Sequence, residues 1–130
     1  MFMKKVFICS PYRGDIGTNT QIARYAARIA VGCGYIPIAP HLYFPAILDD
    51  TNEHERIEGI KLGIELMKET SELWLIGTSG MAFELNAAKA SQIPTRLFDE
   101  KMQEIYPDTL YLDARITEDY RKAVYGLKFA

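Results

Sequence analysis

The hydrophobic positions of the chain fall into short continuous runs separated by longer segments of helical periodicity. The runs "VFIC" (residues 6–9) and "ELWLIG" (72–77) are apolar without alternation, which is typical of parallel strands covered on both faces. Three shorter β-prone segments are "YIPIAP" (35–40), "TRLF" (95–98) and "TLYLD" (109–113). The pattern therefore predicts a sheet of about five strands.

Helical segments alternate with these strands. After the first strand, Thr18 and Gln21 form a capping-box pattern, apolar residues follow at helical spacing, and Gly34 supplies a stop. Further helices are expected over residues 53–69, from near 80 to 91, and over 117–129, whereas "HLYFPAILDD" (41–50) reads as irregular. This alternation predicts a flavodoxin-like or Rossmann-like three-layer α/β domain with a parallel sheet.

Length and charge narrow the class of protein. The 130 residues, 48% of them hydrophobic, suit one domain over residues 1–130 with one core. The net charge of −2 comes from interspersed acids and bases, which argues against a nucleic-acid polymer as partner. The N-terminal segment is too short in apolar residues for a signal peptide, and no apolar run reaches the ~18 residues of a membrane span. We expect a soluble cytoplasmic protein that does not bind membranes.

The residues that commonly bind metals give no recognisable site. Cys9 and Cys33 lie in apolar surroundings, form no CxxC pair and lack histidines at zinc-site spacing. Both are expected to be reduced core residues. Glu53, His54 and Glu55 match no common ligand set and are interpreted as solvated helix charges.

Three loops are expected at the carboxyl ends of the strands, where open α/β sheets bind their ligands. They are "SPYRGD" (10–15), "PHLYFPAILDD" (40–50) and "GTSGM" (77–81). In the first loop, Arg13 offers a planar fork for phosphate beside Gly14, although an exposed loop arginine fits equally. In the second, His41 can stack on a base or close the core. No GxGxxG or GxxxxGK[ST] motif is present.

Glu84 follows the third loop and is unusual for its setting. Its helical neighbours at plus three, four and seven are Ala87, Ala88 and Ser91, a face of small residues. One interpretation is a helix N-terminal acid stabilised by the macrodipole by about 0.3–1 kcal/mol. The other is a carboxylate that meets a ligand, because such a group can attack a sugar carbon.

The segments "KKVFICSPYRG", "PIAPHLYFPAILDD", "ELWLIG" and "GMAFELNAAKASQIP" together resemble the nucleoside 2-deoxyribosyltransferase-like superfamily, over about residues 4–98. The resemblance is to its small, uncharacterised bacterial and phage members. It implies a glutamate nucleophile for the anomeric carbon, which "GMAFEL" places on Glu84. In the branch that hydrolyses deoxynucleoside 5′-monophosphates an arginine–glycine pair binds the phosphate, and "YRG" places that role on Arg13 and Gly14.

Two features depart from the superfamily pattern. An aspartate thought to handle the proton of the leaving base is absent near Gly63, Ile64 and Glu65, where Glu65 is a candidate substitute. The loop before "GMAFE" is shorter and retains Thr78 and Ser79 without an aspartate. Because general acid catalysis contributes about 10²–10⁴-fold, proton delivery becomes the main question.

The expected function is cleavage or transfer at an N-glycosidic bond of a nucleoside or nucleoside 5′-monophosphate, as an N-glycosidase or a deoxyribosyltransferase, with Glu84 as catalytic residue and no metal or organic cofactor. Tyr12, His41 and Tyr43 would flank the base, while Arg13, Gly14 and Ser79 would hold phosphate or sugar oxygens. The full set of expected substrate-binding residues is Ser10, Tyr12, Arg13, Gly14, His41, Tyr43, Ser79, Gly80 and Met81.

Two other functions stay open. The same pocket can serve a non-enzymatic nucleotide-binding or sensor module, and the hydroxyls and glycines of "SPYRGDIGTNT" leave flavin binding as a weaker third idea. A homo-oligomer is expected from the resemblance and from the apolar segment "PHLYFPAIL" beside the site.

Overall fold

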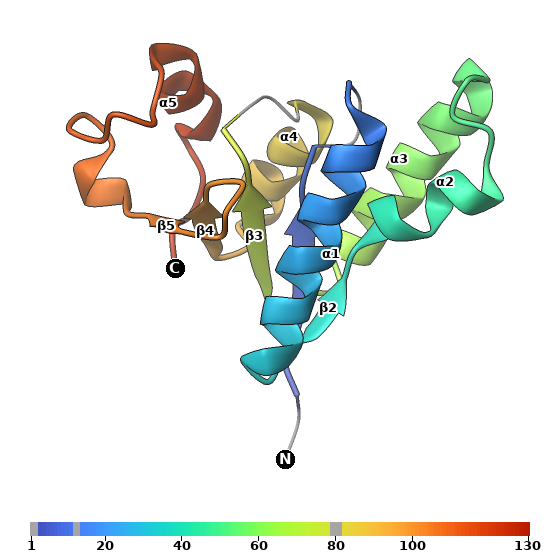
Figure 1. The fold of residues 1–130 in the computed structure, drawn as a ribbon, viewed down its shortest axis with the longest axis horizontal. Coiled ribbons are helices and arrows are strands. Elements are labelled where there is room, and N and C mark those ends of the chain that lie inside the picture. The colour runs from blue at the N-terminus through green and yellow to red at the C-terminus, as the bar shows by residue number, and fades with distance from the viewer. Residues whose placement is uncertain (1–2, 12–13, 79–81) are drawn as a thin grey trace.

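A five-stranded sheet with helices on both faces forms the centre of the computed structural model, which describes residues 3–11, 14–78 and 82–130 (Figure 1). The strand order is β2-β1-β3-β4-β5. The first four strands are parallel and β5 is antiparallel to β4. Their bounds are β1 Lys5–Cys9, β2 Ile36–Ile38, β3 Glu72–Ile76, β4 Thr95–Phe98 and β5 Glu104–Ile105. The predicted flavodoxin-like three-layer fold is confirmed, with the antiparallel edge strand as a difference.

The helices lie in two layers. Their bounds are α1 Ile16–Gly32, α2 Phe44–Ile47, α3 Glu53–Met67, α4 Ala82–Ser91 and α5 Glu118–Val124, with 3₁₀ turns η1 Pro40–Leu42 and η2 Pro107–Thr109. Helix α1 packs on one face of the sheet through Ala26 and Ala30, against Trp74 and Ile76. No helix in the described part of the chain is long and apolar enough to cross a bilayer.

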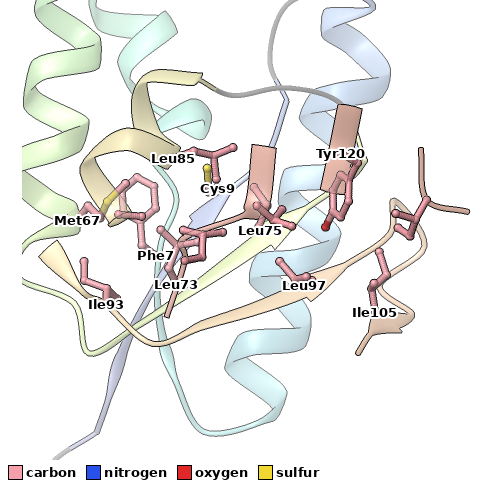
Figure 2. Packing of buried hydrophobic residues seen from close by; sticks show 14 residues of the cluster. Phe7, Cys9, Met67, Leu73, Leu75, Leu85, Ile93, Leu97, Ile105 and Tyr120 are labelled. Atoms are coloured by element: carbon pink, nitrogen blue, oxygen red, sulfur yellow. The ribbon is translucent and has the colours of Figure 1, made fainter. Parts of the chain in front are cut away.

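The opposite face of the sheet carries the larger core cluster, to which α3, α4 and α5 contribute (Figure 2). Leu73 and Leu75 of β3 point into this cluster, whereas Trp74, between them, points toward α1. Alternate residues of the strand are therefore buried on opposite faces. This explains why the strand sequence is continuously apolar.

Helix α1 begins earlier than its capping-box pattern predicts. Asp15 is the N-cap, and its carboxylate accepts hydrogen bonds from the backbone N–H of Thr18 at 3.0 Å and from the Thr18 hydroxyl at 2.8 Å. The prediction of Thr18 as cap was wrong because Asp15 caps the helix three residues earlier, which makes Thr18 the residue whose N–H is capped. Cys33 follows the last turn and is exposed, so it is not a core residue, while Cys9 is buried as expected.

The C-terminal third of the chain differs most from the sequence-based expectation. The segment 109–113 is not a strand: the backbone N–H groups of Thr109 and Leu112 bond to the carbonyls of Tyr106 and Thr109, within local turns. Tyr111 and Leu112 are accordingly 86% and 88% exposed. The fifth strand is β5, and the segment 41–50 contains the short helices η1 and α2 instead of irregular backbone.

Arg115 fixes this C-terminal segment to the end of β4. Its guanidinium donates to the Asp99 carboxylate at 3.0 Å, to the Asp113 carboxylate, and to the carbonyl of Glu104 at 3.2 Å. Burial alone would raise the pKa of Asp99, but backbone N–H donors and Arg115 outweigh it and lower that pKa. The hydrogen bonds from Arg115 hold the pKa of Asp113 at about 2. The network holds the segment just before α5 against the end of β4 and against β5.

Candidate functional site

Glu84 lies at the carboxyl edge of the sheet, in the first turn of α4. Its side chain is 17% exposed, and its Oε1 is 3.8 Å from Nε2 of His41, whose side chain is 27% exposed. His41 belongs to η1, directly after β2, and α4 follows β3. Because β2 and β3 both neighbour β1, the segments that leave their carboxyl ends converge. The fold thus brings together two residues that the sequence analysis assigned to different roles.

Cys9, the last residue of β1, is buried near Glu84. Burial raises the pKa of its thiol well above the ordinary value, and the negative charge of Glu84 raises it further. Figure 2 shows the Cys9 sulfur beside Leu85, the residue that follows Glu84. The thiol therefore stays protonated at neutral pH. Since the thiolate is the nucleophilic form of cysteine, Cys9 is a packing residue of the core and not a nucleophile.

Ser10 follows Cys9 and is fully buried. Its hydroxyl has no hydrogen-bond partner among the residues that the structure describes. An unsatisfied buried hydroxyl costs about 1–3 kcal/mol, so such groups in native structures need an explanation. At the carboxyl end of a central parallel strand, a hydroxyl that hydrogen-bonds a ligand is one explanation.

The loop after β1 contains Gly14 at φ +93°, a left-handed conformation that favours glycine. Among the residues that the structure describes, no atom lies within 4 Å of the position that a Cβ would take there, so the backbone conformation by itself favours glycine. Five of the predicted site residues lie outside the described part of the chain: Tyr12, Arg13, Ser79, Gly80 and Met81.

Glu100, in the loop after β4, is a neighbour of the site that the sequence analysis missed. Its Oε1 accepts the backbone N–H of Thr78 at 3.1 Å. A Cβ on Gly77, which has φ +90°, would lie 3.3 Å from the same oxygen and 3.5 Å from Cδ of Pro11. The loops after β1, β3 and β4 therefore meet here. The sequence contained a signal for Glu100, because two acidic residues (99–100) directly follow a predicted parallel strand.

A cavity of about 280 Å³ lies between α4, α5 and the end of β3. Its lining residues are Leu75, Thr78, Leu85, Thr117, Asp119, Tyr120, Ala123 and Val124. The Tyr120 hydroxyl is buried and has no hydrogen-bond partner in the described residues. Burial raises the pKa of Tyr120 well above its ordinary value, so the phenol stays neutral. No sequence signal identified this cavity, because four of its lining residues come from α5 and a fifth is the N-cap of that helix, far along the chain from β3 and α4.

The other candidates take peripheral positions. Tyr43 is partly exposed and packs its ring against Phe44, with centroids 4.8 Å apart. Glu65 is 70% exposed and its carboxylate pairs with Nζ of Lys68 at 3.0 Å. The carboxylate that was considered as a substitute acid is thus directed to solvent. Asp49, at the end of the segment after α2, accepts hydrogen bonds from the N–H and hydroxyl of Thr51, a pattern typical of a turn.

The strand order and the α/β layers define a flavodoxin-like fold, a class in which ligand sites lie beyond the carboxyl ends of the strands. Within that class, the chain belongs to the family described as domain of unknown function DUF7768, which matches residues 4–98. The matched segment contains β1 to β4 and both residues of the His41–Glu84 pair.

A solved structure has the same fold. It is a 2-deoxyribosyltransferase from the psychrotolerant bacterium Bacillus psychrosaccharolyticus, with 18% sequence identity and a TM-score of 0.61. The similarity covers 93% of this chain and 90% of that chain. It establishes a distant relationship in fold. No curated protein matches the sequence.

Proposed function

We propose that the protein cleaves, or transfers a glycosyl group at, the N-glycosidic bond of a nucleoside or nucleoside 5′-monophosphate, with Glu84 as nucleophile. The observation that carries the proposal is the position of Glu84: a mostly buried carboxylate at the carboxyl edge of the sheet, beside His41. The shared fold with a 2-deoxyribosyltransferase supports the choice of reaction.

The surroundings of Glu84 suit a carboxylate nucleophile. The first turn of a helix favours negative charge through its free N–H groups and macrodipole. Ala88, one turn further along α4, is fully buried in the core cluster and Ala87 packs against that cluster, so the helix is anchored to the core next to Glu84. Attack on C1′ would give a glycosyl-enzyme, which water resolves in a hydrolase and a second base resolves in a transferase.

The remaining site residues take substrate-binding roles in this proposal. Ser10 and Gly14, at the end of β1 and in the loop after it, would meet sugar or phosphate oxygens together with Arg13 and Ser79. His41 and Tyr43 lie at η1 and directly after it, where they would flank the base together with Tyr12. Gly80 and Met81 would complete the pocket before α4. The ligand class is a small nucleoside or nucleotide, and the proposal requires no metal or organic cofactor.

The proposal is tested by incubating the purified protein with a panel of nucleosides and their 5′-monophosphates and measuring released base by chromatography. Glu84→Gln keeps the shape of the side chain and removes the charge. We expect it to retain ligand binding and to lose turnover by several orders of magnitude, because an amide cannot form the glycosyl ester. Glu65→Gln is the matched control, since it neutralises a solvent-directed carboxylate. Full activity of Glu84→Gln would contradict the assignment.

A non-catalytic nucleotide-binding module is the second candidate function. The direction of Glu65 favours it, because the structure gives α3 no inward carboxylate at the place where the resembled enzymes carry their aspartate. This module predicts ligand binding with no released base from the wild type across the whole panel. Turnover therefore separates the two functions.

Assembly into a homo-oligomer also belongs to the proposal. Tyr43, Ile47, Ile57 and Leu62 of the α2–α3 surface are apolar and exposed, and exposed apolar groups of this kind often mark interfaces. Light scattering is expected to give a mass above that of one chain at micromolar concentration. A monomer would refute this part.

A further inference from the structure

We propose that His41 is the general acid and base of the site, donating a proton to the departing base and then taking one from the water that releases the sugar. This inference rests on the proposed function. It assigns a residue to proton delivery, the step for which the sequence lacks the aspartate of the resembled superfamily. The observation behind it is the approach of His41 Nε2 to within 3.8 Å of Glu84 Oε1, with both side chains largely buried at one edge of the sheet.

Proton delivery has few other sources near Glu84. The Cys9 thiol has a raised pKa and is fully buried, so it is a weak acid out of contact with solvent. The phenol of Tyr43 also has a raised pKa through burial. Glu65 faces solvent, and Glu100 accepts the Thr78 N–H. Among the titratable groups of the described residues, His41 is the one that an ion-pair distance joins to Glu84.

The imidazole has the chemistry that this step requires. Histidine changes charge near neutral pH, so one side chain can give a proton and later take one back. Retaining glycosidases hold their two catalytic groups about 5–5.5 Å apart, on either side of the bond that breaks. The separation of 3.8 Å in this structure is shorter than that range, so the mechanism requires the two side chains to move apart by bond rotation when a sugar enters.

The two steps balance as follows. A Glu84 oxygen forms a bond to C1′ while the C1′–N bond breaks; its electron pair stays on the base, which receives the Nε2 proton of the His41 imidazolium. The neutral imidazole next removes a proton from water, whose oxygen bonds to C1′ as the ester bond to Glu84 breaks. Both residues return to their starting charges, and the sum is a nucleoside plus water giving free base plus sugar.

The test compares two substrates that differ in their need for a proton. The base of 2′-deoxyguanosine 5′-monophosphate must be protonated to leave as a neutral molecule, whereas its N7-methylated analogue carries a positive charge and leaves without a proton. In His41→Gln we expect turnover of the first substrate to fall by about 10²–10⁴-fold and that of the second by less than about tenfold. Glu84→Gln is expected to lose both. His54→Gln, which changes an exposed histidine of α3, is the control and should keep both.

Further measurements separate acid catalysis from a structural role. His41→Asn repeats the comparison with a second variant, and thermal unfolding shows whether each variant is folded. In His41→Gly, added imidazole should restore release of guanine, which a side chain needed only for packing would not show. Equal loss of both substrates in folded His41 variants, or no loss in either, would overturn the role of His41 while Glu84 keeps its own. A wild type inactive on the methylated substrate and across the nucleotide panel would instead overturn the proposed function.

Discussion

Replacing Arg115 by Gln is expected to destabilise the protein more than removing an exposed ion pair would. Arg115 donates to Asp99 at 3.0 Å, and the Asp99 side chain is 10% exposed. Without the guanidinium, the Asp99 carboxylate keeps the backbone N–H groups of Lys101 and Gln103, each at 2.9 Å, but loses its cation.

The size of the effect follows from these contacts. A hydrogen bond to a charged group contributes about 1.5–3 kcal/mol, and the bond to the mostly buried Asp99 carboxylate is the one counted here. The free energy of unfolding should therefore fall by about 2–3 kcal/mol, and Tm by roughly 7–10 °C for a chain of this length. Thermal and urea unfolding followed by circular dichroism measure both values.

Lys122→Gln is the matched control, because it removes a 3.6 Å pair with Glu118 in which both side chains are more than two-thirds exposed. We expect that control to change the stability by about 0.5 kcal/mol or less. Similar losses in the two variants would refute the argument that the Arg115 network anchors the C-terminal segment.

The pH dependence adds an independent check on the same network. Asp99 and Asp113 both have pKa values below their ordinary value of 3.8, and that of Asp113 is about 2. A carboxyl group whose pKa is lower in the folded than in the unfolded chain stabilises the folded state at pH values above its unfolded pKa. This contribution is lost as the pH falls through the pKa of the folded state. The wild type should thus exceed Arg115→Gln in free energy of unfolding by the full amount at pH 7. That difference should shrink between about pH 4 and pH 2. A constant difference across that range would contradict the assignment.

Two further predictions concern the site and its neighbouring cavity. Arg13→Ala should weaken binding of 5′-phosphorylated ligands by roughly 1.5–3 kcal/mol, with little effect on plain nucleosides, when measured by calorimetry; equal weakening of both classes would contradict a phosphate-binding role. Tyr120→Phe removes a buried hydroxyl without a partner among the described residues, so thermal unfolding should show unchanged stability or a gain of up to about 1 kcal/mol, and a clear loss would reveal a partner for the phenol.

The central strands could be predicted from sequence because they combine strong local signals with burial on both faces. β1 and β3 lie in the middle of the sheet, and their continuous apolar runs have no helical alternative. The edge of the sheet could not be predicted in this way. β5 has two residues, and its position depends on a tight turn in which the Asp99 side chain accepts the N–H groups of Lys101 and Gln103.

The candidate site was predicted as a set of loops but not as a geometry. Glu84 and His41 were both chosen from the sequence, whereas their approach depends on the order of strands that are far apart in the chain. The contact between Glu100 and Thr78 depends on the same order. Local patterns specify which residues stand at strand ends, and the pairing of strands decides which of those residues meet.

The two borders of the sheet determine how copies of this protein can associate. β2 has three residues with Pro37 in its middle, and β5 has two. A proline has no N–H to offer a further strand, and very short borders give few hydrogen bonds, so both borders disfavour extension of the sheet by a second chain. We therefore expect any assembly to use side chains of helices and loops. Changes to the α2–α3 surface should alter assembly without risk of fibrous stacking through the strands.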